Sequence, residues 1–110
     1  MHLFRRDLER LPEWQIQMAN KDQLLHRDLE IVNELGLHAR SAAKLAKTAQ
    51  QADKGVWLQS GEEEVDAKQI IDILTLGACR GDQVRVRIDV ETDLAILDQI
   101  AELFKSGFGE

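Results

Sequence analysis

Short runs in which apolar and polar residues alternate recur along this chain from about residue 25 to its end. Four runs have the two-residue period of a β-strand, and they cover residues 25–32, 56–59, 62–65 and 83–90. The last run is the clearest, since its apolar residues share one face: Val84, Val86, Ile88 and Val90. Ser60 and Gly61 separate the second run from the third, so these two runs predict a β-hairpin.

Three other segments predict helices, over residues 39–52, over residues 67–76, and after Thr92 to about Lys105. The apolar stripe of the first helix consists of Ala42, Leu45, Ala46 and Ala49, and that of the last of Leu94, Leu97, Ala101 and Phe104. A glycine follows each segment, which is typical of a helix end. Asp66 and Thr92 precede the second and third helices as expected N-caps.

The order of elements is therefore strand, helix, strand, strand, helix, strand, helix. Each helix has an apolar face, and the strands have one apolar face. This combination predicts an α+β fold in which helices cover one side of an antiparallel sheet.

Residues 1–24 do not fit this order, and we expect them to form an N-terminal extension of a domain that covers residues 25–110. Pro12 is acceptable in the first turn of a short helix, which would place Trp14, Met18 and Leu25 on one side. A flexible tail is the alternative for this extension.

Composition and charge exclude several classes of function. The chain has 110 residues and a net charge of −6, so we expect one domain with a modest core and no binding to nucleic acid, which requires a basic surface. No apolar run approaches the roughly 20 residues of a membrane span, and charged residues interrupt any signal-peptide pattern at the start.

Cys79 is the single cysteine, so we expect a cytoplasmic protein without a disulfide. His2 and His26 lack metal-ligand spacing, so no metal or cofactor is expected.

The candidate chemistry lies in residues 36–40 (GLHAR), where His38 precedes an alanine-rich helix and Arg40 follows two residues later. A helix start offers unpaired backbone amides and the positive end of the helix dipole, a favourable place for a phosphate. A neutral imidazole there can accept a phosphoryl group, and the guanidinium of Arg40 can stabilise the new charge. The alternative is that His38 is only a helix cap or a surface side chain.

Two blocks of sequence, together with the closing residues, carry a resemblance to a known family. Residues 31–40 (IVNELGLHAR) resemble the active-site signature of the histidine-containing phosphocarrier protein (HPr) of the bacterial phosphoenolpyruvate-dependent phosphotransferase system. Residues 65–68 (VDAK) and 74–78 (LTLGA), followed by Gly81 and Asp82, resemble the second helix of that family and the turn after it. The closing residues 106–110 (SGFGE) resemble many C-termini of the family.

The resemblance implies a four-stranded antiparallel sheet with three helices on one face, an open-faced sandwich. It implies that His38 takes a phosphoryl group on Nδ1 from phosphorylated enzyme I and passes it to an enzyme IIA in sugar uptake, with no cofactor. Such a protein is a monomeric carrier rather than an enzyme. The phosphate would be bound at Ala39, Arg40 and Ser41, and the partners would dock on Ile70, Ile71 and Leu74.

Two positions depart from the family pattern. Ser41 stands where the family usually has proline, which removes some stiffness from the first turn and adds one backbone amide near the phosphate. Gln69 stands where many relatives have a regulatory serine, and its spacing from Asp66 predicts a capping box in which Gln69 reaches back to the Asp66 amide.

Two other functions stay open for the same fold. One is a regulatory module that acts through protein contacts alone, and the other is a phosphocarrier of the nitrogen branch. His38 and Arg40 favour the carriers, whereas Ser41, Gln69 and the N-terminal extension are compatible with a regulator.

Overall fold

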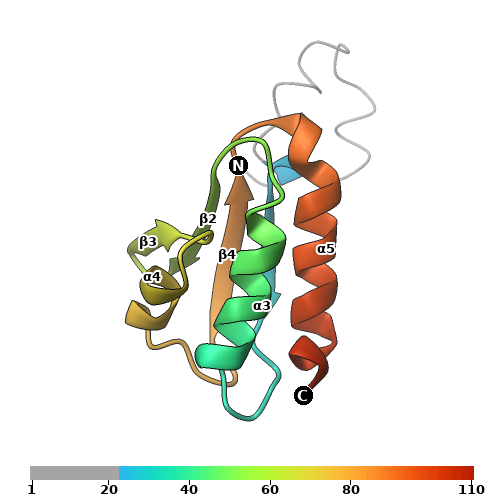
Figure 1. Ribbon diagram of the computed structural model, residues 1–110. Coiled ribbons are helices and arrows are strands. Elements are labelled where there is room, and N and C mark those ends of the chain that lie inside the picture. The colour runs from blue at the N-terminus through green and yellow to red at the C-terminus, as the bar shows by residue number, and fades with distance from the viewer. Residues whose placement is uncertain (1–22) are drawn as a thin grey trace, which may run out of the picture.

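A four-stranded antiparallel sheet forms the centre of the computed structural model, which describes residues 23–110 (Figure 1). Its strands are β1 (His26–Glu30), β2 (Val56–Ser60), β3 (Glu63–Asp66) and β4 (Gln83–Ile88), in the spatial order β1-β4-β2-β3. β2 and β3 form the predicted hairpin, and β4 pairs with β1 on one side and with β2 on the other.

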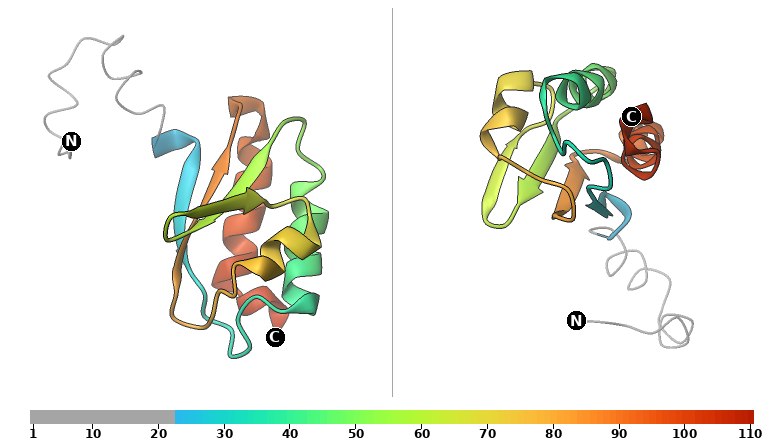
Figure 2. Two further views of the ribbon diagram at one scale, coloured as in Figure 1. Left: turned by 90° about the vertical axis from the view of Figure 1, so that its left-hand side faces the viewer. Right: turned by 90° about the horizontal axis from the view of Figure 1, so that it is seen from below.

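Three helices cover one face of this sheet, and the other face is open (Figure 2). They are α3 (Ala39–Ala49), α4 (Ile70–Thr75) and α5 (Leu94–Lys105), and the short 3₁₀ turns η1 (Glu91–Asp93) and η2 (Gly107–Gly109) flank α5. The predicted α+β architecture is confirmed.

The core lies between the sheet and the helices. Val84, Val86 and Ile88 of β4 are buried beneath the helices, as the alternating pattern predicts. The predicted Val90 lies beyond the end of the strand, directly before η1, and is only half-buried. The predicted stripe of α3 is also buried, and it consists of Ala42, Leu45, Ala46 and Ala49. In α5 the buried residues are Leu97, Ile100 and Phe104, whereas the predicted Leu94 and Ala101 are only half-buried.

The open face of the sheet carries charged side chains in register. Asp28 of β1 lies opposite Arg85 of β4, and their side chains form an ion pair with an Nε–Oδ1 distance of 2.7 Å. Arg87 pairs with Glu64 and lies 5.8 Å from the ring centre of Trp57. This pattern explains why polar residues alternate with apolar ones along β4.

Several predicted boundaries are wrong by a few residues. β1 ends at Glu30, because Ile31 leaves the strand and its amide and carbonyl pair with Asp82 and Gly81 of the loop before β4. Thr92 lies inside η1, and Asp93 is the residue that precedes α5. The carboxylate of Asp93 is buried and accepts the backbone amides of Asp53 and Lys54, so this residue links the start of α5 to the loop after α3.

The predictions for Pro12, Trp14 and Met18 lie outside the described residues, and the division into an extension and a domain stays a prediction. Within residues 23–110, no helix is both long enough and apolar enough to cross a membrane.

Candidate functional site

His38 is the N-cap residue of α3, the helix that the GLHAR sequence begins. Its own amide donates to Ser41 Oγ (3.0 Å), and the Ser41 hydroxyl donates in turn to the carbonyl of Gly36 (3.0 Å). Ser41 is fully buried, and its hydroxyl joins two points of the loop that carries His38. At this position, where the family usually has proline, the serine holds the loop by hydrogen bonds instead of by a rigid ring.

Gly36 sets the path of this loop, because its φ of +66° is in the left-handed region that favours glycine. A Cβ atom at this position would lie 2.7 Å from the carbonyl oxygen of Ala78 and 2.9 Å from Cα of Cys79. Leu37 donates its amide to the same Ala78 carbonyl (3.0 Å). The His38 loop therefore packs directly against the loop between α4 and β4.

The first turn of α3 presents amides that have no intrahelical acceptor. Ala39 and Arg40, which belong to this turn, are exposed, and the turn contains no acidic residue. The charge of Arg40 is the smallest of the causes that lower the pKa of the Glu110 carboxyl. The start of α3 therefore combines first-turn amides with one exposed cation, and this combination suits a phosphoryl group.

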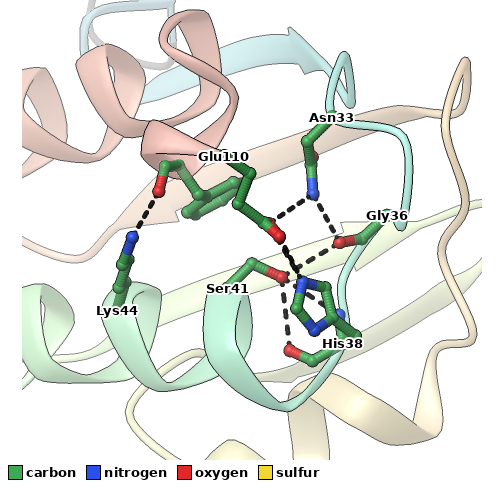
Figure 3. A network of polar contacts seen from close by, with 7 residues as sticks. Asn33, Gly36, His38, Ser41, Lys44 and Glu110 are labelled. Atoms are coloured by element: carbon green, nitrogen blue, oxygen red, sulfur yellow. Dashed lines mark hydrogen bonds and ion pairs between the residues drawn. The ribbon is translucent and has the colours of Figure 1, made fainter.

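Glu110 contacts the imidazole from the other end of the chain (Figure 3). Its Oε2 lies 2.6 Å from Nε2 of His38, and its Oε1 accepts a hydrogen bond from Nδ2 of Asn33 (2.9 Å). The hydrogen bond with His38 holds the pKa of the Glu110 carboxyl below its ordinary value, with smaller contributions from Asn33 and Arg40. Sequence reasoning gave no role to Asn33 or Glu110, although both lie in the blocks that carry the resemblance.

The turn that carries Glu110 is fixed to the helices. Phe108 has a φ of +58°, is buried, and packs edge-on against Phe104 of α5 with ring centres 4.9 Å apart. The ammonium group of Lys44 on α3 donates to the carbonyl of Phe108. These contacts place the turn η2 over the first part of α3.

α4 is the second helix near this loop, and its exposed face is apolar. Ile71 exposes 71% of its surface and Ile70 39%, whereas Leu74 is half-buried against the core. Leu35, three residues before His38, exposes 70%, and sequence reasoning did not include it. Contiguous exposed apolar residues are typical of an interaction surface.

The predicted capping box at the start of α4 is wrong. The helix begins at Ile70, so Gln69 is its N-cap residue rather than the third residue of its first turn, and its exposed side chain makes no capping bond. Asp66 instead accepts the Lys68 amide on its side chain (2.9 Å) and the Gln69 amide on its carbonyl (3.2 Å). Residues 67–69 are therefore a turn.

Comparison with known proteins agrees with this geometry. The family model described as the PTS HPr component phosphorylation site matches residues 25–106. The chain belongs to the HPr family of phosphocarrier proteins. The HPr of Xylella fastidiosa (strain Temecula1) is 38% identical over 87 residues, which are 79% of this chain and 98% of that protein. The phosphocarrier protein NPr of Escherichia coli K12 is 37% identical over 83 residues, 74% of this chain and 92% of NPr.

Solved structures of the HPr family have the same fold. HPr-C-His from Thermoanaerobacter tengcongensis superposes with a TM-score of 0.73 at 32% identity, over 77% of this chain and 96% of that one. The chain is thus a phosphocarrier-family protein of the phosphotransferase system. Its similarity to HPr and NPr is nearly equal, so identity does not assign it to one branch.

Proposed function

We propose that this protein carries a phosphoryl group on His38, which it receives from phosphorylated enzyme I and delivers to an enzyme IIA. The observation that carries the proposal is the position of His38 in an HPr-family chain: it is the N-cap residue of α3, its side chain is 30% exposed, and Arg40 follows in the first turn of the helix. Transfer then requires positioning and charge stabilisation, with Ala39, Arg40 and Ser41 around the phosphate. The protein is a carrier without a cofactor, not an enzyme.

The partners dock on the apolar residues of α4 next to His38, namely Ile70, Ile71 and Leu74. α4 follows a turn that is tied to α3, since Gln50 Nε2 donates to the Lys68 carbonyl (2.9 Å) and Lys68 Nζ donates to the Ala52 carbonyl (3.1 Å). These two bonds hold the start of α4 against the end of α3, and the Leu37–Ala78 hydrogen bond (3.0 Å) holds the loop after α4 against the loop that carries His38. We further propose that the protein acts as a cytoplasmic monomer, because an exposed docking surface must stay free for successive partners.

To test the function, phosphoenolpyruvate and a catalytic amount of enzyme I are added to the protein, and its intact mass is followed by mass spectrometry. We expect the protein to gain one acid-labile phosphoryl group, which an added enzyme IIA then removes. A protein that stays unmodified, or whose phosphate resists acid, contradicts the proposal.

The nitrogen branch is a second candidate, supported by the 37% identity to NPr. Parallel reactions with a sugar-branch and a nitrogen-branch enzyme I separate the two. The enzyme I that phosphorylates the protein faster identifies its branch.

A further inference from the structure

The hydrogen bond between His38 and Glu110 distinguishes the two nitrogens of the imidazole. Nε2 faces the carboxylate, with 2.6 Å to Oε2 and 3.0 Å to Oε1 (Figure 3). An ionised carboxylate can only accept hydrogen bonds, so the proton of this contact belongs to Nε2. In a neutral imidazole the other nitrogen, Nδ1, then carries the lone pair.

Asn33 holds this carboxylate in place. Its side chain is buried with 6% exposure, and its Nδ2 donates to Glu110 Oε1 (2.9 Å) and to the Gly36 carbonyl (2.7 Å). Both partners are acceptors, so the amide fits only with its nitrogen toward them. One polar side chain thereby joins the carboxylate to the loop that carries His38.

Asn33 Oδ1 is buried and has no hydrogen-bond partner within residues 23–110. A buried carbonyl without a partner is unfavourable, and an apolar residue would avoid this penalty. The asparagine thus keeps one oxygen unpaired while its Nδ2 joins the Gly36 carbonyl to Glu110, and an apolar residue could make neither of these bonds.

We propose that Glu110, oriented by Asn33, is a positioning residue that keeps the proton of neutral His38 on Nε2 and leaves Nδ1 as the nucleophile. This inference rests on the proposed function. It adds the reason why one nitrogen reacts and names the two residues responsible.

The transfer step then balances as follows. The lone pair of Nδ1 forms the new N–P bond while the bond from phosphorus to the donor atom of enzyme I breaks, and its electron pair leaves with the donor. The ring keeps the Nε2 proton and gains positive charge, which the Glu110 carboxylate stabilises at hydrogen-bond distance. Delivery to enzyme IIA is the same step in reverse, with the acceptor atom of that partner as the nucleophile.

The decisive measurement is the ¹⁵N NMR spectrum of the His38 ring in the full chain, recorded at a pH where the imidazole is neutral. In the wild type we expect the form protonated on Nε2 to predominate. Glu110→Gln keeps the size of the side chain, but its amide can donate to a bare Nε2 as well as accept from a protonated one. We expect this variant to populate both tautomers and to take up phosphate roughly three- to tenfold more slowly, the loss expected for a partly exposed charge-assisted hydrogen bond.

Glu102→Gln is the matched control, because it removes one negative charge from an exposed side chain of α5 whose ion pair is with Lys105. We expect wild-type tautomers and wild-type transfer in this control. An equal loss in both variants would show a general charge effect and would overturn the proposal.

Asn33→Asp tests the second residue. It keeps the shape of the side chain, but the amide group that donates to Glu110 and Gly36 becomes a carboxylate oxygen, which can only accept hydrogen bonds and repels the Glu110 carboxylate. We expect it to shift the tautomers in the same direction as Glu110→Gln, with backbone NMR spectra showing that the fold is intact. If Asn33→Asp does not fold, the Glu110→Gln result decides alone. Unchanged tautomers in Glu110→Gln overturn this inference while phosphorylation of the wild type upholds the proposed function. Absence of phosphate on wild-type His38 overturns both.

Discussion

His38 combines a partly exposed side chain with a position at the start of α3, two residues before Arg40. The sequence predicts the histidine and Arg40, because the signal for a helix start with a nearby cation is local. It does not predict the contact of His38 with Glu110, which lies 72 residues away and leaves no periodic pattern. Tertiary packing of Phe108 on Phe104 creates that contact.

Arg40→Ala tests the role of charge at this residue. Because the Arg40 side chain belongs to the exposed surface of α3, we expect unfolding free energy to change by less than about 0.5 kcal/mol, as for other surface substitutions. The rate of phosphoryl uptake should fall at least about tenfold, because a charged donor to phosphate is lost. Parallel thermal melts and mass-based rates measure both quantities. A destabilised variant with normal transfer would assign Arg40 a structural role.

Gly36→Ala tests the close contact that positions the His38 loop. Gly61 is the matched control, because its φ of +61° is similar to +66° at Gly36, but a Cβ atom there meets nothing within 4 Å. From backbone strain alone, we expect Gly61→Ala to lower the free energy of unfolding by about 1 kcal/mol. In Gly36→Ala the new Cβ atom also overlaps Ala78 and Cys79, so we expect the free energy of unfolding to fall by about 2–4 kcal/mol. Urea unfolding measures the difference. Equal losses would show that the two loops separate without penalty.

At the scale of elements, the sequence predicts the type of each helix and strand but not every end. The segment 67–76 is predicted as one helix, because it is rich in apolar residues and lies between a capping residue, Asp66, and Gly77. In the structure its first three residues form a turn, since the Asp66 carboxylate accepts the Lys68 amide and Lys68 is tied to the end of α3. Side-chain bonds to the backbone compete with the helix here, and periodicity does not contain that information.

Gln69→Ser tests control at the start of α4. Gln69 is exposed, makes no capping bond, and is not a substrate for a serine kinase. Serine is a favourable N-cap, so we expect the variant to be as stable as the wild type or up to about 1 kcal/mol more stable. A serine kinase of this system should phosphorylate the variant and not the wild type. Equal phosphorylation of both proteins would place the control at another residue.

At the scale of the whole molecule, the sheet separates a charged face from a face covered by helices. The loops and helix starts at one end bring together residues from 33 to 110, and the alternation of elements in the sequence is sufficient to predict this fold class. Sequence alone does not say which apolar residues of α4 stay exposed, because its apolar residues are more numerous than one buried stripe requires. Packing buries Ile73 and leaves Ile70 and Ile71 at the surface.

Ile70→Ser tests the docking surface, and Leu24→Ser is its control. The two residues have similar exposure, 39% and 41%, but Leu24 precedes β1 at the opposite end of the sheet from the start of α3 (Figure 1). We expect Ile70→Ser to weaken binding to enzyme I about five- to tenfold, as for an interface residue of moderate importance, and Leu24→Ser to leave the affinity unchanged. Titration calorimetry measures both. Similar affinities of the two variants for enzyme I would show that enzyme I does not dock on α4.

His38 is the proposed carrier of the phosphoryl group, and the intact masses of two histidine variants after reaction with enzyme I and phosphoenolpyruvate test this role. His38→Ala removes the proposed acceptor, and His26→Ala removes a histidine of β1 in the sheet. We expect His26→Ala to gain one acid-labile phosphoryl group and folded His38→Ala to gain none. Undiminished acid-labile phosphorylation of His38→Ala would contradict this role.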